Sequence, residues 1–260
     1  MGHPAPEDLA SELRIQDPAV ALYREHGDGP LLLVCEHASA SIPARYADLG
    51  LSVAERTAHI GWDPGALVLA QALADRLESP LVHARHSRLL MDLNRDPAAP
   101  DAIVSTSDGI RIPGNQALDE AERSLRRRWL YEPFHAAIEA LAAARAERGR
   151  PSVLVSIHSF TPVLQGHARP WQIGVLSDRD RRLADALLAD LRRDPALTVG
   201  DNQPYAPSDG VYHSMDRHGQ RQGRPCVMLE IRNDQLIAPA GPAHWAERLA
   251  QAFERALGRV

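Results

Sequence analysis

Histidine and glutamate side chains follow strand-like runs of the sequence, at the point where each run ends. Glu36 and His37 follow one apolar run, His158 ends a second, and Glu230 lies near the end of a third. In open α/β sheets, ligands bind at the carboxyl ends of the strands, so we expect these side chains to share one crevice. For His158 alone, a core histidine bonded to the backbone is the common alternative.

These residue types suit hydrolysis assisted by a metal ion. Imidazole nitrogens and a carboxylate oxygen are ligands that Zn²⁺ accepts at catalytic sites, with one position left for water. A neighbouring carboxylate can take the proton as water attacks a polarised carbonyl. Asn94 and Arg95 end a further strand-like segment, and such side chains can hold a substrate carboxylate at two points.

The elements that position these residues alternate between strands and helices. We predict a polar lead-in over 1–28 with one short helix, and a single α/β domain over 29–260. Strands are predicted at 31–35, 80–86, 153–158, 171–178 and 226–232, with 87–97 as a further candidate. Helices are predicted near 42–50, 64–79, 118–148, 180–193 and 242–257, with loops at 97–116 and 200–222. The alternation indicates a mixed, mainly parallel sheet with helices on both faces.

Composition excludes several classes of partner. The chain has 260 residues, 44% of them hydrophobic, and a net charge of -5, which offers no basic excess for nucleic acid. Its two cysteines, Cys35 and Cys226, lie in apolar runs and are expected to be reduced. The first residues lack a signal-peptide core, and no run approaches the roughly 18 apolar residues of a membrane span. We expect a soluble, cytoplasmic protein with a small-molecule partner and no membrane partner.

Several motifs resemble a known family. The segments SIHSF, MDLNRD and LEIRND resemble the zinc carboxypeptidase and aspartoacylase superfamily. More closely, the segments CEHASASIP, GWDPGA, HSRLLMDLNR, IGVLSDRD and LEIRND together resemble the N-formylglutamate amidohydrolase family, over about residues 30–255. The resemblance implies a phosphorylase/hydrolase-like fold and an enzyme of amino-acid metabolism that uses one Zn²⁺ to hydrolyse an N-acyl amino acid carrying a carboxylate, such as N-formylglutamate.

The resemblance also implies roles for individual residues. It makes His37 and His158 zinc ligands, Asn94 and Arg95 the grip on the substrate carboxylate, and Glu230 the general base. The alternative for Glu230 is a buried ion pair with an arginine such as Arg232. A peptidase, another deacylase and a binding protein without metal are the alternative functions, and the oligomeric state is left open.

The third metal ligand departs from the superfamily pattern. The superfamily places a glutamate three residues after the first zinc-binding histidine, where this chain has Ala40. Asp63 in GWDPGA is our first choice, with Glu36 and His59 as alternatives. A helix N-cap is an equal alternative for Asp63, because it precedes Pro64 at the start of a predicted helix.

Three further residues are candidate substrate contacts. Arg88 is a possible second grip on the substrate, and its alternative is a surface ion pair. Tyr212 and His213 lie in the loop DNQPYAPSDGVYHSMDRHG, which could close over a substrate. Their alternative is an ordinary loop position.

Overall fold

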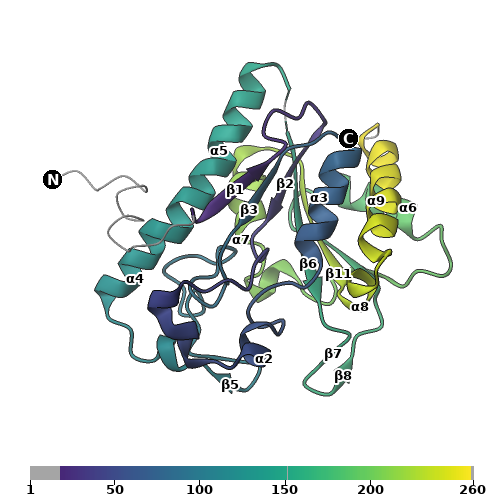
Figure 1. The fold of residues 1–260 in the computed structure, drawn as a ribbon. Coiled ribbons are helices and arrows are strands. Elements are labelled where there is room, and N and C mark those ends of the chain that lie inside the picture. Colours follow the sequence, from purple (N-terminus) through teal and green to yellow (C-terminus); the bar gives the residue numbers. More distant parts are fainter. Residues whose placement is uncertain (1–17, 151, 259–260) are drawn as a thin grey trace.

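A central β-sheet runs through the computed structural model, which describes residues 18–150 and 152–258 (Figure 1). The sheet has seven strands in the order β1-β3-β2-β6-β11-β9-β10. Their bounds are β1 (Val20–Tyr23), β2 (Leu31–Cys35), β3 (Leu81–Ala84), β6 (Val153–Phe160), β9 (Ile173–Leu176), β10 (Val199–Asp201) and β11 (Cys226–Arg232). Two hairpins stand apart from it: β4 (Thr106–Ser107) with β5 (Ile110–Arg111), and β7 (Val163–Leu164) with β8 (His167–Ala168).

The four central strands of the sheet are parallel. Strand β2 pairs in parallel with β3 and β6, and β11 pairs in parallel with β6. The outer pairings β1 with β3 and β11 with β9 are antiparallel, and β10 runs parallel to β9. The predicted mixed, mainly parallel sheet is confirmed, and the carboxyl ends of β2, β6 and β11 lie side by side.

Helices cover both faces of the sheet, as predicted (Figure 1). On one face lie α3 (Ala66–Arg76), α6 (Arg182–Leu191), α8 (Asp234–Ile237) and α9 (Gly241–Leu257). On the other lie α5 (Glu132–Glu147) and α7 (His213–His218). The strands are buried on both sides because alternate side chains serve the two cores: Leu31 and Leu33 enter one, and Leu32 and Val34 enter the other.

The predicted helix over 118–148 is almost continuous but changes its winding in the middle. It consists of α4 (Glu120–Arg126), a π-helical turn (Arg127–Tyr131) and α5. Pro133 lies at the start of α5 and has no N–H to donate to the preceding turn, so the regular bonding pattern is interrupted there. Short helices complete the described chain: α2 (Val53–Arg56) and 3-10 helices Ala44–Gly50, Pro113–Asn115, Pro207–Asp209 and Gln220–Gln222.

The candidate strand over 87–97 is wrong. This segment forms turns, because side chains rather than a neighbouring strand bond its carbonyl groups. Asn115 donates to the carbonyl of Leu89, Arg126 to that of Leu90, and His135 lies 3.0 Å from that of Leu93. Asn94 and Arg95 therefore come from an irregular segment rather than from a strand end.

Two other predictions are corrected in detail. The segment 42–50 forms a 3-10 helix, and Ala47, Asp48 and Leu49 adopt positive φ angles that a regular helix excludes. The predicted loop 200–222 contains the end of β10 and the six-residue helix α7, which is too short to show helical periodicity in sequence.

The lead-in over 1–28 contributes the edge strand β1 to the sheet. Residues 1–17, which make up most of the lead-in, and any short helix within them are outside the described residues. Among the helices of the described ranges, none is long and apolar enough to cross a membrane.

Candidate metal and active site

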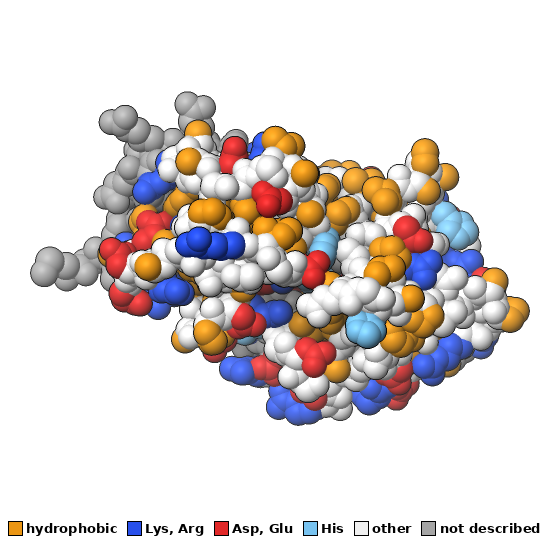
Figure 2. Space-filling model, turned by 90° about the horizontal axis from the view of Figure 1, so that it is seen from below, with side chains coloured by type: hydrophobic (Ala, Val, Ile, Leu, Met, Phe, Trp, Pro, Cys, Tyr) orange, Lys and Arg blue, Asp and Glu red, His pale blue; other side chains and the backbone are white. Residues whose placement is uncertain are grey.

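Polar side chains converge at the carboxyl ends of β2, β6 and β11. Glu230 and His158 are directly paired in the parallel ladder of β11 and β6, so their side chains face the same side of the sheet. Glu36 and His37 follow the last residue of the neighbouring strand β2. Figure 2 shows this end of the molecule, where a recess near the middle is bordered by acidic, basic and histidine side chains.

His37, Asp63 and His158 form a buried cluster whose geometry suits a metal ion. One possible ligand atom from each lies within 4.8 Å of the others. Asp63 Oδ2 is 2.8 Å from Nδ1 of His158 and 3.4 Å from Nδ1 of His37, so both rings turn the same nitrogen toward one carboxylate. These are the three residues predicted as ligands, and the structure brings them together.

The side chain of Asp63 does not cap the helix that follows it. Its Oδ2 accepts a hydrogen bond from the backbone N–H of Ser159 at 3.2 Å, across the sheet end. Its backbone N–H donates to the carbonyl of His37 at 2.9 Å, which joins the segment before α3 to the end of β2. Asp63 is thus held against both histidines by contacts that are distant in sequence.

A carboxylate lies behind each histidine ring. Asp92 Oδ1 is 2.8 Å from Nε2 of His37, and Glu36 Oε2 is 3.2 Å from Nε2 of His158. Ser156 donates its hydroxyl to the same Glu36 oxygen at 2.7 Å. Such carboxylates orient a metal-binding imidazole and raise its basicity. Glu36 therefore supports a histidine rather than joining the cluster.

The electrostatic balance of the cluster favours a cation. Burial opposes ionisation, but the charge of His158 and hydrogen bonds to neighbouring side chains lower the pKa of Glu36 to about 2. The pKa of Asp63 is also held well below its usual range, against burial, by the two histidines. The pKa of His158 is raised despite burial, because Glu36 and Asp63 favour a positive charge there. The same field favours a metal ion.

Four buried polar atoms of the site residues lack hydrogen-bond partners in the part of the chain that the structure describes. They are Nδ1 of His37, on the side facing Asp63, Oε2 of Glu230, Oε1 of Glu36 and Nε2 of His158. Buried polar groups without partners are costly and uncommon in folded proteins. A metal ion bound by His37, Asp63 and His158 would satisfy the first atom, so the residues present fit a metal.

Glu230 lies beside this cluster with an unusual carboxyl group. It is 5% exposed, and burial raises its pKa to about 7. The alternative role of Glu230 was an ion pair with Arg232. Arg232 does not form it, because its Nε donates to Asp234 at 2.8 Å instead. A carboxyl group that titrates near neutral pH can both accept and return a proton.

Two neighbouring cavities lead to these groups. An inner cavity of about 120 Å³ is lined by His37, Asp63, His158 and Glu230 among others. An outer cavity of about 290 Å³ adjoins it and includes residues of the β4–β5 and β7–β8 hairpins. Four residues line both: His59, Arg88, Arg95 and Tyr205. The cavities thus form one path from the surface to the cluster.

The predicted grip residues lie in this path but already have partners. Arg88 donates to Asp92, and Arg95 Nε donates to Asp101 at 2.8 Å. Asn94 lines the inner cavity, while its amide donates to the carbonyl of Val211 and accepts from the N–H of Ser214. His59, the other alternative ligand, lies 3.8 Å from Asp108 and outside the cluster.

Tyr212 and His213 are not brought to the inner cavity. The Tyr212 hydroxyl lies 3.8 Å from the sulfur of Cys226, inside the core. His213 Nε2 lies 2.6 Å from the hydroxyl of Tyr131 on the long helix. Both line a separate surface pocket with Arg95, so their side chains are placed away from the cluster.

Sequence reasoning missed two residues of the site. Asp92 was not singled out, although a carboxylate within the apolar run LLMDL is costly to bury without a partner, and that signal could have found it. Tyr205, which lines both cavities, gives no such signal because tyrosine is common in loops. Its position follows only from the fold.

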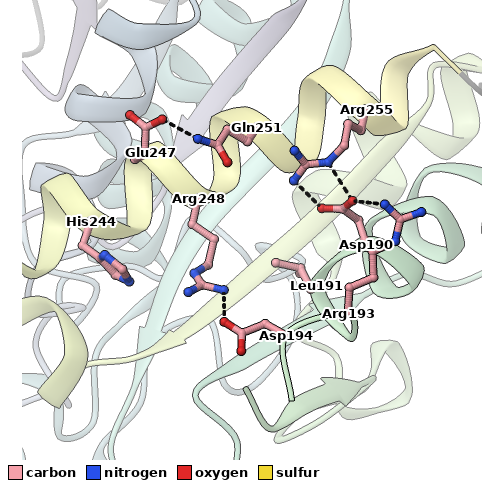
Figure 3. A pocket seen from close by; sticks show the side chains of 9 residues that line it. All are labelled: Asp190, Leu191, Arg193, Asp194, His244, Glu247, Arg248, Gln251 and Arg255. Atoms are coloured by element: carbon pink, nitrogen blue, oxygen red, sulfur yellow. Dashed lines mark hydrogen bonds and ion pairs between the residues drawn. The ribbon is translucent and has the colours of Figure 1, made fainter. Parts of the chain in front are cut away.

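A larger groove lies far from this chemistry, between α6 and α9 (Figure 3). Its volume is about 480 Å³, but its arginines are already paired: Arg255 and Arg193 with Asp190, and Arg248 with Asp194. The described residues there form no cluster of metal-binding type. We therefore place the candidate site at the strand ends.

The sheet and the converging groups define an α/β protein of hydrolase type with a candidate metal site at its strand ends. The chain belongs to the N-formylglutamate amidohydrolase family, whose model matches residues 29–237. The family prediction is thereby confirmed, and it supports an amidohydrolase. No curated protein matches the chain.

Two solved structures resemble the chain over nearly its whole length. The gene product Atu2144 from Agrobacterium tumefaciens is 44% identical, with a TM-score of 0.92, and the match covers 94% of this chain and 97% of that one. An N-formylglutamate amidohydrolase from Ralstonia eutropha JMP134 is 21% identical, with a TM-score of 0.70, covering 94% and 98%. The second likeness supports the fold.

Proposed function

We propose that the chain is a zinc-dependent amidohydrolase that removes a small acyl group from an N-acyl amino acid, with N-formylglutamate as the first candidate. The observation that carries this proposal is the meeting of a His-Asp-His cluster with Glu230 in one buried cavity. Family membership supports the reaction type. The small inner volume, about 120 Å³, favours a formyl group over a long acyl chain.

His37, Asp63 and His158 would hold the zinc ion. When bound, zinc polarises the scissile carbonyl and activates water for attack. Asp92 and Glu36 keep the two imidazole rings turned toward Asp63. A reaction at this point would occur away from bulk water, since all three ligand residues are buried.

Glu230 would move the proton. Its carboxylate accepts a proton from the attacking water and returns it to the nitrogen of the departing amino acid. A carboxyl pKa near 7 suits both steps, because the group then exchanges protons readily at neutral pH. Its Oε2, which has no hydrogen-bond partner among the described residues, is available for this contact.

Arg88, Asn94 and Arg95 would position the α-carboxylate of the substrate. All three line the inner cavity. The two arginines already bond to Asp92 and Asp101, so an incoming carboxylate would share their guanidinium groups with these acids. Asn94 supports this wall by bonding to the 211–214 segment.

The cellular setting is part of the same proposal. Cys35 and Cys226 are free and buried, which suits the reducing cytoplasm. The net charge of -5 argues for a small-molecule partner rather than nucleic acid.

A hydrolysis screen with metal analysis tests the proposal. The purified protein is assayed on N-formyl, N-acetyl and N-succinyl amino acids, before and after chelation and zinc addition, and its metal content is measured. We expect one zinc ion per chain and the fastest turnover with N-formyl substrates. A protein that binds no zinc, or hydrolyses none of these amides when zinc-loaded, would contradict it.

A further inference from the structure

Arg169 is a buried arginine without an acidic partner among the residues that the structure describes. It is 7% exposed, and no carboxylate forms an ion pair with it there. Its Nη1 donates to the hydroxyl of Tyr205 at 2.9 Å, while its Nη2 has no hydrogen-bond partner. A buried positive charge without a counter-ion is costly, so its presence calls for an explanation.

The fold holds Arg169 firmly against the wall of the inner cavity. It follows the β7–β8 hairpin, and its backbone N–H donates to the carbonyl of Pro162 at 2.8 Å. Its guanidinium carbon lies 5.7 Å from the ring centre of Phe160 and 5.0 Å from that of Tyr205. Both rings line the inner cavity, and Tyr205 also lines the outer one. Arg169 thus contacts two rings of the cavity wall without being a lining residue of either cavity.

The two arginines that line both cavities differ from Arg169 in their partners. Arg88 is bonded to Asp92, and Arg95 to Asp101. Their charges are therefore balanced within the protein, whereas the charge of Arg169 is balanced by no ion pair in the described ranges. The cavity wall at Tyr205 carries the excess positive charge.

The Tyr205 hydroxyl can act as a hydrogen-bond donor that is strengthened by the charge of Arg169. Its oxygen accepts from Arg169, and its own hydrogen has no acceptor in the described structure. Burial and the nearby charge of Glu230 raise the pKa of Tyr205, so the hydroxyl keeps its proton. Donation from a cation strengthens the next hydrogen bond in such a chain.

We propose that the Tyr205 hydroxyl binds the side-chain carboxylate of an acidic N-acyl amino acid, with Arg169 as the positioning residue behind it. The inference rests on the proposed function and assigns the preference for an acidic side chain to this pair. Arg88 and Arg95 serve the α-carboxylate, while the Tyr205–Arg169 pair distinguishes glutamate from glutamine.

The central experiment compares N-formyl-L-glutamate with N-formyl-L-glutamine. We expect the zinc-loaded protein to prefer the glutamate derivative in kcat/KM by a factor on the order of 10 to 100, as for a hydrogen bond to a charged group. Tyr205→Phe and Arg169→Gln should each bring this ratio close to one. The double variant should lose no more than the larger single loss, because the two residues act through one contact.

Two controls separate recognition from folding. Arg255→Gln removes an arginine of α9 far from the cavities and should leave the ratio unchanged. Melting temperatures of all variants show whether Arg169 only stabilises the Phe160 and Tyr205 rings. A purely structural role would lower the melting temperature of Arg169→Gln and keep the glutamate preference of the remaining folded protein.

Binding of the free amino acids tests the pair without turnover. L-glutamate should bind the zinc-loaded protein more tightly than L-glutamine, measured by calorimetry, and both variants should abolish the difference. If nothing is hydrolysed but this binding pattern holds, the proposed reaction fails and the recognition pair stands. An unchanged ratio in both variants, or an equal loss for both amino acids, would overturn the pair.

Discussion

Glu230 lies directly opposite His158 in the parallel pairing of β11 with β6, and both side chains point to the same side of the sheet. Neighbouring parallel strands keep this spacing rigidly, because hydrogen bonds on both sides of each residue fix the register. The proposed proton acceptor and one proposed metal ligand are therefore held by two buried, adjacent strands of the sheet. Catalytic groups on strands are placed more accurately than groups on loops.

Glu230→Gln should remove most of the activity and leave the metal in place. Glutamine has nearly the same size but cannot accept the proton, so kcat should fall by a factor on the order of 10²–10⁴. The measurements are kcat, zinc content and melting temperature of the variant. Glu247→Gln on α9 is the matched control and should keep full activity. A fully active Glu230→Gln protein would exclude Glu230 as the base.

The ligands and the carboxylates behind them should affect zinc binding to different degrees. His158→Ala or His37→Ala should leave the purified protein without stoichiometric zinc, because each removes one of three ligands. Asp92→Asn should weaken zinc binding by a factor on the order of 10 to 100, since Asp92 orients His37 but is not itself a ligand. Competition with a chelator measures both effects. Equal zinc affinity in wild type and His158→Ala would rule out the cluster as the metal site.

Arg95→Lys should weaken substrate binding through geometry rather than charge. Lysine keeps the positive charge but lacks the planar group that bonds Asp101 and the carbonyl of Gly210 while facing the cavity. We expect a KM for carboxylate substrates raised roughly tenfold, with zinc content unchanged. Steady-state kinetics on N-formylglutamate check this. The same KM in the variant would remove Arg95 from the substrate contacts.

His135 should make the protein less stable in mild acid. It is 2% exposed, it bonds the carbonyl of Leu93, and burial holds its pKa well below the usual value. Below about pH 6.5 the unfolded chain takes up a proton there that the folded protein does not. Unfolding therefore becomes easier as the pH falls from 6.5, and the contribution is fully present only above that value.

His135→Gln tests this dependence, because glutamine can still donate to Leu93 but does not titrate. The difference in melting temperature between pH 8 and pH 5.5 should be smaller in the variant than in wild type. His244→Gln, at an exposed position on α9, is the control. If both variants show the wild-type difference, His135 does not titrate between the two states.

The strand ends could be predicted from sequence because their signals are local. His158 and Glu230 each lie within an apolar, β-branched run, and a polar residue there is conspicuous. Local signals failed at 87–97, which looks like a strand but forms turns. Its backbone carbonyl groups are bonded by the side chains of Asn115, Arg126 and His135. No local sequence pattern reveals these contacts.

The supporting residues could not be predicted, because their roles depend on contacts between distant segments. Asp92 and His37 are 55 positions apart in the sequence and come together only in the folded chain. Arg169 becomes notable only because it bonds Tyr205 and pairs with no acid among the described residues. An arginine in a sequence does not show whether an acidic side chain will pair with it in the folded protein.

Strand β1 has a consequence for how the chain can be shortened. It forms one outer edge of the sheet by pairing with β3, although it belongs to the first 28 residues. A chain that began at Gly29 would keep every residue of the site. It would also expose the unpaired N–H and C=O groups of β3, and such an open edge recruits strands from other molecules. Strand β1 is therefore expected to protect the protein against aggregation rather than to contribute to catalysis.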